Sequence, residues 1–301
     1  MSIFESWVTD FVAYLRYERN YSEGTIKPYR DNLKAFGEYI RSVDSELDWT
    51  SITTDIVRDW IVDMMDRGVS AAGVCPKLSA VKSFYRFLLR RGLVENDPAH
   101  LVPSPRKAKV LPYFVREKDM NHLLDDIPFA DTFEGRRDRL ILVMLYTTGI
   151  RASELLGLNI ADVDLAERQL TVLGKRNKQR IIPFGDELAE NLQKYLLTRE
   201  QCLKDGWDRD AIFLNPHRGK RISYALLRKV VRDNLSLVTM QQKRSPHVLR
   251  HSFATSMLNH EADLESVKEL LGHEALTTTA IYTHTTFEEL KKTYNHAHPR
   301  A

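Results

Sequence analysis

Residues 245–273 read SPHVLRHSFATSMLNHEADLESVKELLGH, and this stretch predicts two consecutive helices. Pro246 stands just before an apolar stripe at helical spacing, which is typical of a helix start, so we expect a helix over residues 247–259. A second stripe predicts a helix over residues 264–271, which the following Gly272 can end. Basic side chains therefore stand at the ends of both predicted helices, with His247 and Arg250 at the first and His273 after the second.

The sequence around this stretch mixes helices with a small amount of β-structure. A strongly apolar run over residues 137–146 predicts a helix that ends at Gly149. Two short β-rich runs, 169–173 and 180–184, flank the polar loop 174–179 and indicate a hairpin. Apolar residues at helical spacing predict further helices over residues 187–203, 224–237 and 287–294.

The first part of the chain is helical throughout. Residues 1–97 carry four apolar stripes at helical spacing, which are Phe4, Trp7, Phe11, Tyr14 and Leu15, then Ile26, Tyr29, Leu33, Phe36 and Ile40, then Ile56, Val57, Trp60, Ile61 and Met64, and finally Val74, Leu78, Val81, Phe84, Tyr85 and Leu88. Residues 98–112 follow with four prolines and a cluster of basic residues, so we predict a semi-rigid linker that either contacts phosphates or is simply solvated. The fold class we predict is mainly α with a small β-sheet: a four-helix domain over 1–97 and an α+β domain over 113–301.

Composition places few limits on the partner. The chain of 301 residues has a formal net charge of only +3, so a polyanion partner would have to be recognised by locally clustered charge. Cys75 and Cys202 are the only cysteines and lie far apart, which argues against a disulfide framework or a zinc site of cysteine pairs. The sequence shows no signal-peptide pattern and no apolar run of membrane-spanning length, so we expect a cytoplasmic protein that does not associate with membranes.

Two basic residues share one face of the helix predicted over 247–259. His247 and Arg250 are three residues apart and near the positive end of the helix, where an anion such as a phosphate can bind. Taken alone, such a pair is more often formed by surface or capped residues. His247 and His251 also have a metal-ligand spacing, but no glutamate follows His247, and Arg250 would repel a cation, so we favour a packing role for His251.

Four further residues are ambiguous when each is taken alone. Arg151 lies in the apolar segment TTGIRASELLGL, where it can pair with Glu154 or meet a ligand phosphate. Lys175 stands in the predicted hairpin loop, His273 follows Gly272, and Tyr282 follows a threonine run. In isolation these three favour an exposed turn lysine, a capped histidine and a packed tyrosine.

The ordered combination is informative where its parts are not. An arginine after Thr-Gly, a lysine in a hairpin, His-x-x-Arg, Leu-Gly-His and then a tyrosine nine residues later together resemble the tyrosine recombinase family. The segments TGIRASELLGL, GKRNKQRIIPFG and TTTAIYTH resemble its Xer branch, as do residues 245–273, and the terminal His298-Pro299-Arg300-Ala301 is more similar to XerD than to XerC. Arg176 and Glu261 stand where many members have glycine. The resemblance covers essentially the whole chain, with residues 1–97 corresponding to the core-binding domain.

This resemblance implies a chemistry for six residues. Tyr282 would attack a DNA phosphodiester to form a 3′-phosphotyrosine and a free 5′-hydroxyl, and no ATP or other cofactor is needed because one phosphodiester replaces another. No metal is expected either, because the five other side chains would supply the positive charge that other enzymes take from magnesium. His247 would accept the phenolic proton, since a phenol of ordinary pKa near 10 is a poor nucleophile at neutral pH. Arg151 and Arg250 would hold the non-bridging oxygens, His273 would donate to them, and Lys175 would protonate the departing 5′-oxygen.

The resemblance also implies partners. We expect double-stranded DNA, a cyclic tetramer on two sites formed with itself or a second Xer-type recombinase, and activation by a DNA translocase as an open possibility. The terminal helix over 287–294 would dock on the neighbouring protomer, or alternatively on its own domain. Rival hypotheses are a mobile-element integrase of the same family, a type IB topoisomerase, and a non-enzymatic architectural DNA-binding protein.

Overall fold

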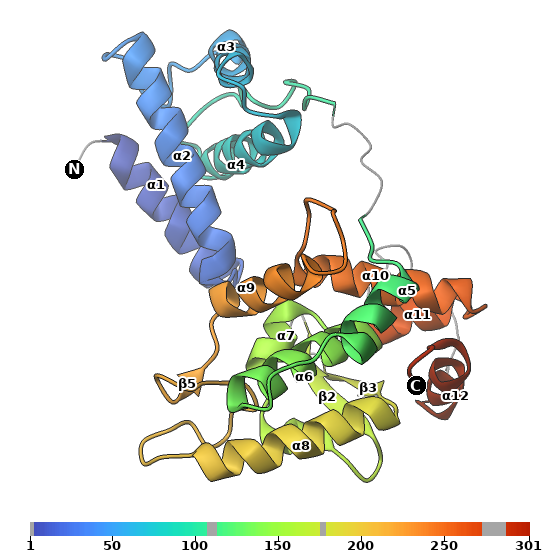
Figure 1. The fold of residues 1–301 in the computed structure, drawn as a ribbon. Coiled ribbons are helices and arrows are strands. Elements are labelled where there is room, and N and C mark those ends of the chain that lie inside the picture. The colour runs from blue at the N-terminus through green and yellow to red at the C-terminus, as the bar shows by residue number, and fades with distance from the viewer. Residues whose placement is uncertain (1–2, 107–112, 175–178, 273–286) are drawn as a thin grey trace. The chain divides into compact units, whose positions relative to one another are not determined.

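The computed structural model describes residues 3–106, 113–174, 179–272 and 287–301, and the chain divides into two compact units, Met1–Val110 and Leu111–Ala301 (Figure 1). Each unit has its own apolar core. The first is helical in its described part, and the second combines helices with two small sheets. The predicted fold class, mainly α with a small β-sheet, is confirmed.

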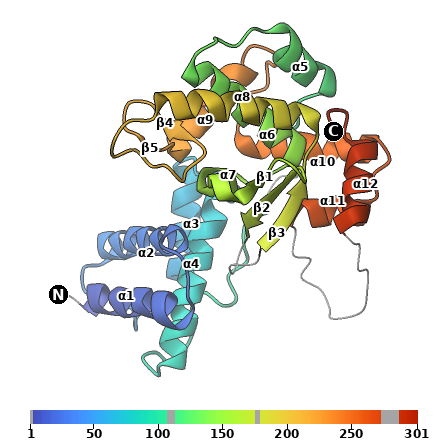
Figure 2. The same cartoon turned by 90° about the horizontal axis from the view of Figure 1, so that it is seen from below.

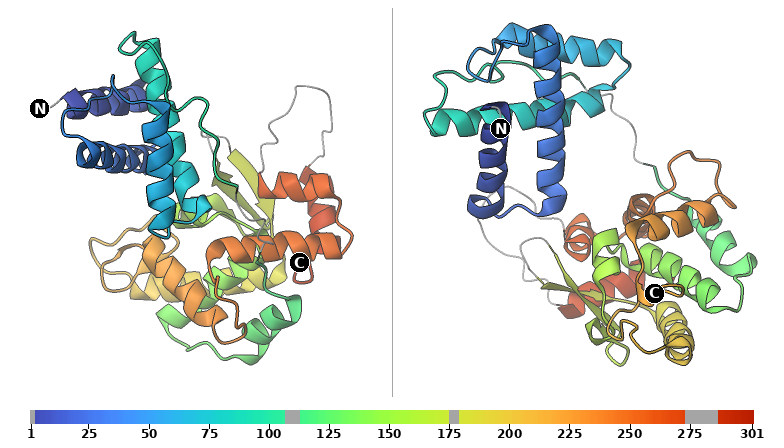
Figure 3. Two further views of the ribbon diagram at one scale, coloured as in Figure 1. Left: turned by 90° about the horizontal axis from the view of Figure 1, so that it is seen from above. Right: turned by 90° about the vertical axis from the view of Figure 1, so that its left-hand side faces the viewer.

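The first unit contains the four predicted helical segments. Helix α1 (Ile3–Ala13) continues into the π-helical turn η1 (Tyr14–Glu18) and is followed by α2 (Glu23–Val43), α3 (Thr54–Asp66) and α4 (Ala71–Arg90). Figure 3 shows α1 and α2 side by side with α4 crossing them. Aromatic rings dominate the core because bulky rings from several helices meet at its centre, among them Phe11, Phe36, Trp49, Trp60 and Phe84.

The segment after α4 folds back onto this unit. Ala99 and Val102 are buried in its core, and the Lys82 ammonium group donates to the Val102 carbonyl at 2.6 Å. The first residues of the predicted linker 98–112 therefore pack against α4. Residues 107–112, with Lys107 and Lys109, lie outside the described residues.

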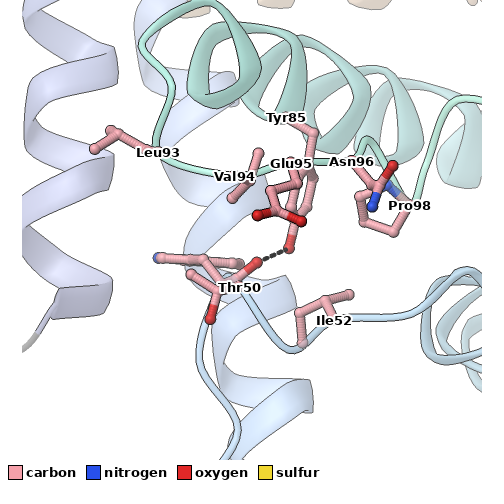
Figure 4. Close-up of a pocket in the computed structure, with 9 residues that line it drawn as sticks. Thr50, Ile52, Tyr85, Leu93, Val94, Glu95, Asn96 and Pro98 are labelled. Carbon is pink, nitrogen blue, oxygen red and sulfur yellow. Dashed lines mark hydrogen bonds between the residues drawn. The ribbon is translucent and has the colours of Figure 1, made fainter.

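A pocket of about 370 Å³ opens in the first unit beside the end of α4 (Figure 4). Its lining includes Thr50, Tyr85 and Glu95, and the Tyr85 hydroxyl donates to the Trp49 carbonyl at 3.0 Å. None of the lining residues is basic, so the pocket offers no charge that would bind a phosphate.

The second unit is built around helix α6 (Phe133–Thr148), in which every residue from Leu140 to Thr148 is buried. Because the second half of α6 is apolar on all sides, it has to be covered by other elements. The covering helices include α8 (Asp186–Cys202), α9 (Tyr224–Leu235) and α10 (Pro246–Asn259). Short helices α5 (Glu117–Asn121), η2 (His122–Asp126), α7 (Ala152–Gly157) and η3 (Ile160–Asp162) complete this part.

The main sheet is antiparallel in the order β1 (Val163–Asp164), β2 (Gln169–Leu173) and β3 (Gln179–Pro183) (Figure 2). The predicted hairpin is present, with its second strand beginning one residue earlier than expected. Leu170 pairs with Ile182 and Val172 pairs with Arg180, so these four side chains share one face of the sheet. Leu170, Val172 and Ile182 are buried, and Arg180 is therefore directed toward the interior of the unit. A second hairpin joins β4 (Leu214–Asn215) to β5 (Lys220–Arg221).

The C-terminal helices form a separate small core. Leu290, Tyr294 and Ala297 of α12 (Phe287–Ala297) pack with residues of α10 and of α11 (Leu264–Leu271). The last residue, Ala301, lies against Gly185, where a Cβ atom would be only 2.6 Å from the Ala301 Cα. In this structure α12 therefore docks on its own unit. None of the helices in the described part of the chain is long and apolar enough to cross a membrane.

Candidate active site

Arg250 occupies a buried position on α10. Its side chain is held between two helix ends, with Nη1 donating to the Gly149 carbonyl at 2.6 Å and Nη2 donating to the Leu271 carbonyl at 2.5 Å. Only 6% of the residue is exposed. Burial, followed by the charges of Arg151 and Arg180, lowers the pKa of Arg250 to about 10, so the side chain is still a cation at neutral pH.

Arg151 lies at the start of α7, directly after the turn that ends α6. Gly149 makes this turn with a φ of 58°, and a Cβ there would be 2.5 Å from the Phe253 ring, so only glycine fits. The Arg151 guanidinium donates to Glu154 at 2.8 Å and to the Gly272 carbonyl at 2.5 Å. The predicted Arg151–Glu154 ion pair is thus present, and 36% of the Arg151 side chain is exposed.

Arg180 lies beside Arg151 and Arg250, and these three arginines with Glu154 form one cluster, although no motif in the sequence marks Arg180 as a site residue. It makes two hydrogen bonds to Glu154, at 2.6 and 2.9 Å, and its Nε donates to the Leu270 carbonyl at 3.2 Å. The signal that could have found it is its position two residues before the buried Ile182 on a strand, which places both on the same face.

Glu154 is the anion around which the arginines gather. Its side chain is only 3% exposed. Burial alone would raise the pKa of this carboxyl, but hydrogen bonds from Arg180 and from the Arg151 main chain and side chain outweigh burial, and the pKa is lowered. Glu154 is therefore ionised at neutral pH, and three guanidinium cations surround one carboxylate.

The carbonyls at the end of α11 provide the remaining acceptors. Arg180, Arg250 and Arg151 donate in turn to three successive carbonyls, those of Leu270, Leu271 and Gly272. The last carbonyls of a helix lack helical partners and carry its partial negative charge, so they offset the mutual repulsion of three cations. Gly272 reverses the chain here with a φ of 61°.

His247 lies one turn before Arg250 on α10 and is exposed, as a residue that meets a substrate has to be. Its ring stands edge-on to that of His251, with the centroids 4.6 Å apart. Burial, then the neighbouring His247 and Arg250, lower the pKa of His251. Among residues 3–106, 113–174, 179–272 and 287–301, no group of three His, Cys, Asp or Glu side chains could hold a metal ion.

Of the six predicted site residues, the structure thus brings together Arg151 and Arg250, and it places His247 one turn before Arg250 on α10. Lys175, His273 and Tyr282 lie outside the described residues. Arg180 and Glu154 are added to the cluster. The three arginines and Glu154 together carry an excess of two positive charges, and part of Arg151 is open to solvent. This arrangement suits the binding of an oxyanion such as a phosphate, because guanidinium groups bind its oxygens in pairs.

Comparison with known proteins identifies both units. A sequence profile described as the phage integrase family matches residues 114–289, and one described as the phage integrase N-terminal SAM-like domain matches residues 8–92. The chain is 38% identical to the tyrosine recombinase XerC of Chlorobaculum tepidum, over 98% of this chain and 95% of that protein. It is 38% identical to XerC of Bacillus subtilis, with 99% and 97% covered, and 34% identical to XerD of Oceanobacillus iheyensis, with 98% of each covered.

Solved structures share the fold. The XerH recombinase in a post-cleavage complex with its palindromic difH substrate aligns with a TM-score of 0.72 at 22% identity, over 96% of this chain and 80% of that chain. The Tn1549 transposon integrase in complex with transposon right end DNA aligns with a TM-score of 0.71 at 17% identity, over 98% and 99%. At these sequence identities the comparison shows a shared fold and nothing more.

Proposed function

The chain belongs to the phage integrase family of tyrosine recombinases, and from this premise we propose that it cleaves and rejoins DNA at a specific site through a 3′-phosphotyrosine at Tyr282. The observation that carries the proposal is the convergence of Arg151 and Arg250 beside the end of α11. Two guanidinium groups fixed at one place can hold both non-bridging oxygens of a phosphodiester and offset the charge that develops at phosphorus.

Each of the six residues has a role in this proposal. His247 accepts the proton of Tyr282, Arg151 and Arg250 hold the scissile phosphate, and His273 donates a further hydrogen bond to it. Lys175 protonates the departing 5′-oxygen. The exposed position of His247, one turn before the buried Arg250, supports this division between a residue that moves a proton and one that holds an anion.

The biological reaction we propose is Xer-type resolution of chromosome dimers during chromosome segregation in the cytoplasm. Residues 1–97 form the DNA-clamping domain, residues 98–112 the linker, and residues 113–301 the catalytic domain. The working assembly is a tetramer on two DNA sites, formed with itself or with a second Xer-type recombinase, and a DNA translocase would be its activator. Relatives that carry the names XerC and XerD over nearly the full chain support this proposal.

Covalent capture tests the proposed chemistry. Wild-type protein expressed in cells should become attached to DNA, and sequencing the attached DNA should identify one short site. A nicked suicide duplex that carries this site should then trap a covalent adduct with wild-type protein and none with Tyr282→Phe, because phenylalanine has no hydroxyl to attack phosphorus. An adduct with Tyr282→Phe would overturn the assignment of the nucleophile.

The protein and the captured DNA site also distinguish the proposed function from its rivals. A type IB topoisomerase would relax supercoiled plasmid that lacks the site, whereas the proposed recombinase requires the site and exchanges strands between two copies of it. A mobile-element integrase would exchange strands between two unlike sites. An architectural protein would bind DNA without any adduct.

A further inference from the structure

All three guanidinium nitrogens of Arg180 donate to protein acceptors. Nη1 and Nη2 bind the two oxygens of Glu154, and Nε binds the Leu270 carbonyl. Its side chain is 15% exposed, against 36% for Arg151. Arg180 therefore has little left to offer a substrate, and its position has to be explained through its neighbours.

Arg180 determines which atoms of Glu154 remain for Arg151. The carboxylate accepts four hydrogen bonds, two from Arg180, one from the Arg151 guanidinium and one from the Arg151 main-chain nitrogen. Because Arg180 occupies one direction at each oxygen, Arg151 makes only a single side-chain bond to Glu154, and the donors that are not used by Glu154 or by the Gly272 carbonyl remain for the site. Without Arg180, Arg151 would be drawn into the paired geometry that guanidinium and carboxylate prefer.

Arg180 also fixes the second anchor of Arg151. A Cβ added to Gly272 would lie 3.0 Å from the Arg180 Cδ, so the stem of Arg180 lies against Gly272. The carbonyl of Gly272 accepts from Arg151, and that of Leu270 accepts from Arg180. One side chain on β3 thus holds both the carboxylate and the helix end that orient Arg151.

We propose that Arg180 is a positioning residue that orients Arg151 toward the scissile phosphate through Glu154 and the end of α11. The inference rests on the proposed function, because it concerns the geometry of the same site. It makes Arg180 necessary for the rate of the chemical step without making it a contact to DNA. A displacement of about 1 Å in a group that holds the transition state costs on the order of a hundredfold in rate.

The experiment measures adduct formation on the nicked duplex that carries the captured site, in single turnover, at saturating DNA. Arg180→Gln should lower the rate constant by about tenfold to a hundredfold while the dissociation constant for the duplex changes by less than about threefold. Arg180→Lys should recover part of the rate, because one ammonium group can bind Glu154 but cannot also reach the Leu270 carbonyl. Arg180→Gln at the wild-type rate would overturn the proposal.

A matched control separates positioning from general loss of structure. Arg199 is an arginine of the same unit that is still more buried than Arg180, and it donates to the Ala211 carbonyl at 3.0 Å, away from Glu154. Arg199→Lys should lower the unfolding temperature yet keep the wild-type rate constant for the folded fraction. If Arg199→Lys and Arg180→Lys lose rate in proportion to their loss of stability, Arg180 is merely structural and the proposal is wrong.

A double-mutant cycle tests the route through Arg151. Arg151→Lys alone should be slow, and adding Arg180→Gln should slow it by no more than about threefold, because Arg180 acts through a group that is already altered. Fully additive losses would show an independent role and overturn the proposal. If the wild-type protein itself forms no adduct, the proposed function fails, and the inference fails with it.

Discussion

At the scale of single residues, Glu154 explains how three arginines can share one small volume. A buried carboxylate is costly unless it is paired and fully hydrogen-bonded, and here both oxygens have donors. The same carboxylate reduces the repulsion among Arg151, Arg180 and Arg250. Its charge is therefore a condition for assembling the site, and changing it should affect stability in a way that depends on pH.

Glu154→Gln tests this condition. At pH 7 the variant should be less stable than wild type by about 3 kcal/mol, because two guanidinium groups lose their counter-charge. The pKa of Glu154 is lowered in the folded state, so its stabilising contribution is complete above the ordinary pKa of 4.5 and is lost as the pH falls through the lower folded value. Urea unfolding at pH 7, 5 and 3.5 should therefore show a difference between the two proteins that shrinks on the acid side.

Glu190→Gln provides the matched control. Glu190 pairs with Lys194 on the surface of α8, where both side chains are about two-thirds exposed. Such a pair contributes little, so this variant should match wild type at all three pH values. A difference for Glu154→Gln that does not change with pH would argue against an ionised Glu154 in the folded protein.

At the scale of helices and strands, the position of the C-terminal residues depends on their close contact with Gly185. This residue precedes α8, and a Cβ there would lie 2.6 Å from the Ala301 Cα and 2.8 Å from its carbonyl oxygen. Close backbone approach of this kind excludes every residue but glycine. Arg300, next to Ala301, pairs with Glu187 at 2.6 Å on the first turn of α8, so the contact also places an ion pair.

Gly185→Ala should therefore displace residues 298–301 and loosen α12. We expect faster amide hydrogen exchange in residues 287–297 and a loss of stability of about 1–3 kcal/mol, the range for overpacking a closed contact. Gly157→Ala is the control, because a Cβ there meets nothing within 4 Å. Unchanged exchange in α12 of Gly185→Ala would show that the tail does not rest on this glycine.

Helix and strand positions were largely predictable because periodicity reports burial. The helix expected over residues 264–271 is present with the same bounds, and that expected from residue 137 begins at Phe133. Glu261, just after α10, adopts the left-handed conformation with a φ of 65°. The short β1 and the β4–β5 hairpin were missed because two-residue strands have no period to read.

The site was predictable only in part, and for a physical reason. Arg151, His247 and Arg250 belong to a recognisable ordered pattern, and Glu154 is a near neighbour of Arg151 in sequence. Alternation along the strand could place Arg180 on the inner face of the sheet, but its partners became visible only through the register of β2 with β3 and the position of the end of α11, 90 residues further along the chain. Such long-range contacts leave no local pattern in one sequence.

At the scale of the whole molecule, charge is concentrated locally and is nearly balanced overall. With 44 basic and 41 acidic residues, long-range attraction to DNA is weak, and affinity has to come from groups placed at the phosphates. We therefore expect assembly on DNA to be governed by contacts between protomers that are already bound to DNA. The C-terminal helix is the surface on which the proposed tetramer depends.

The position of α12 predicts different assembly states with and without DNA. In the single chain Leu290 is buried, and Tyr294 and Ala297 are fully buried, so the apolar face of α12 is covered by α10 and α11. A covered face cannot dock on a neighbour, so the free protein should be a monomer. For α12 to dock on a neighbouring protomer, it has to leave its own unit. Binding of protomers to paired DNA sites would place the corresponding surface of a neighbour close enough to receive it.

Sedimentation velocity with Tyr282→Phe protein measures this without strand cleavage. We expect a monomer alone and four copies with two duplexes that carry the site.

Gly185→Ala, which loosens α12, should self-associate without DNA more readily than wild type, since the apolar face of α12 is freed. A wild-type tetramer in the absence of DNA would contradict the coupling of exchange to DNA binding. A DNA complex that forms normally after Tyr294→Ala would contradict the role of α12 as the joining element, because this change removes the largest buried side chain of the apolar face of α12.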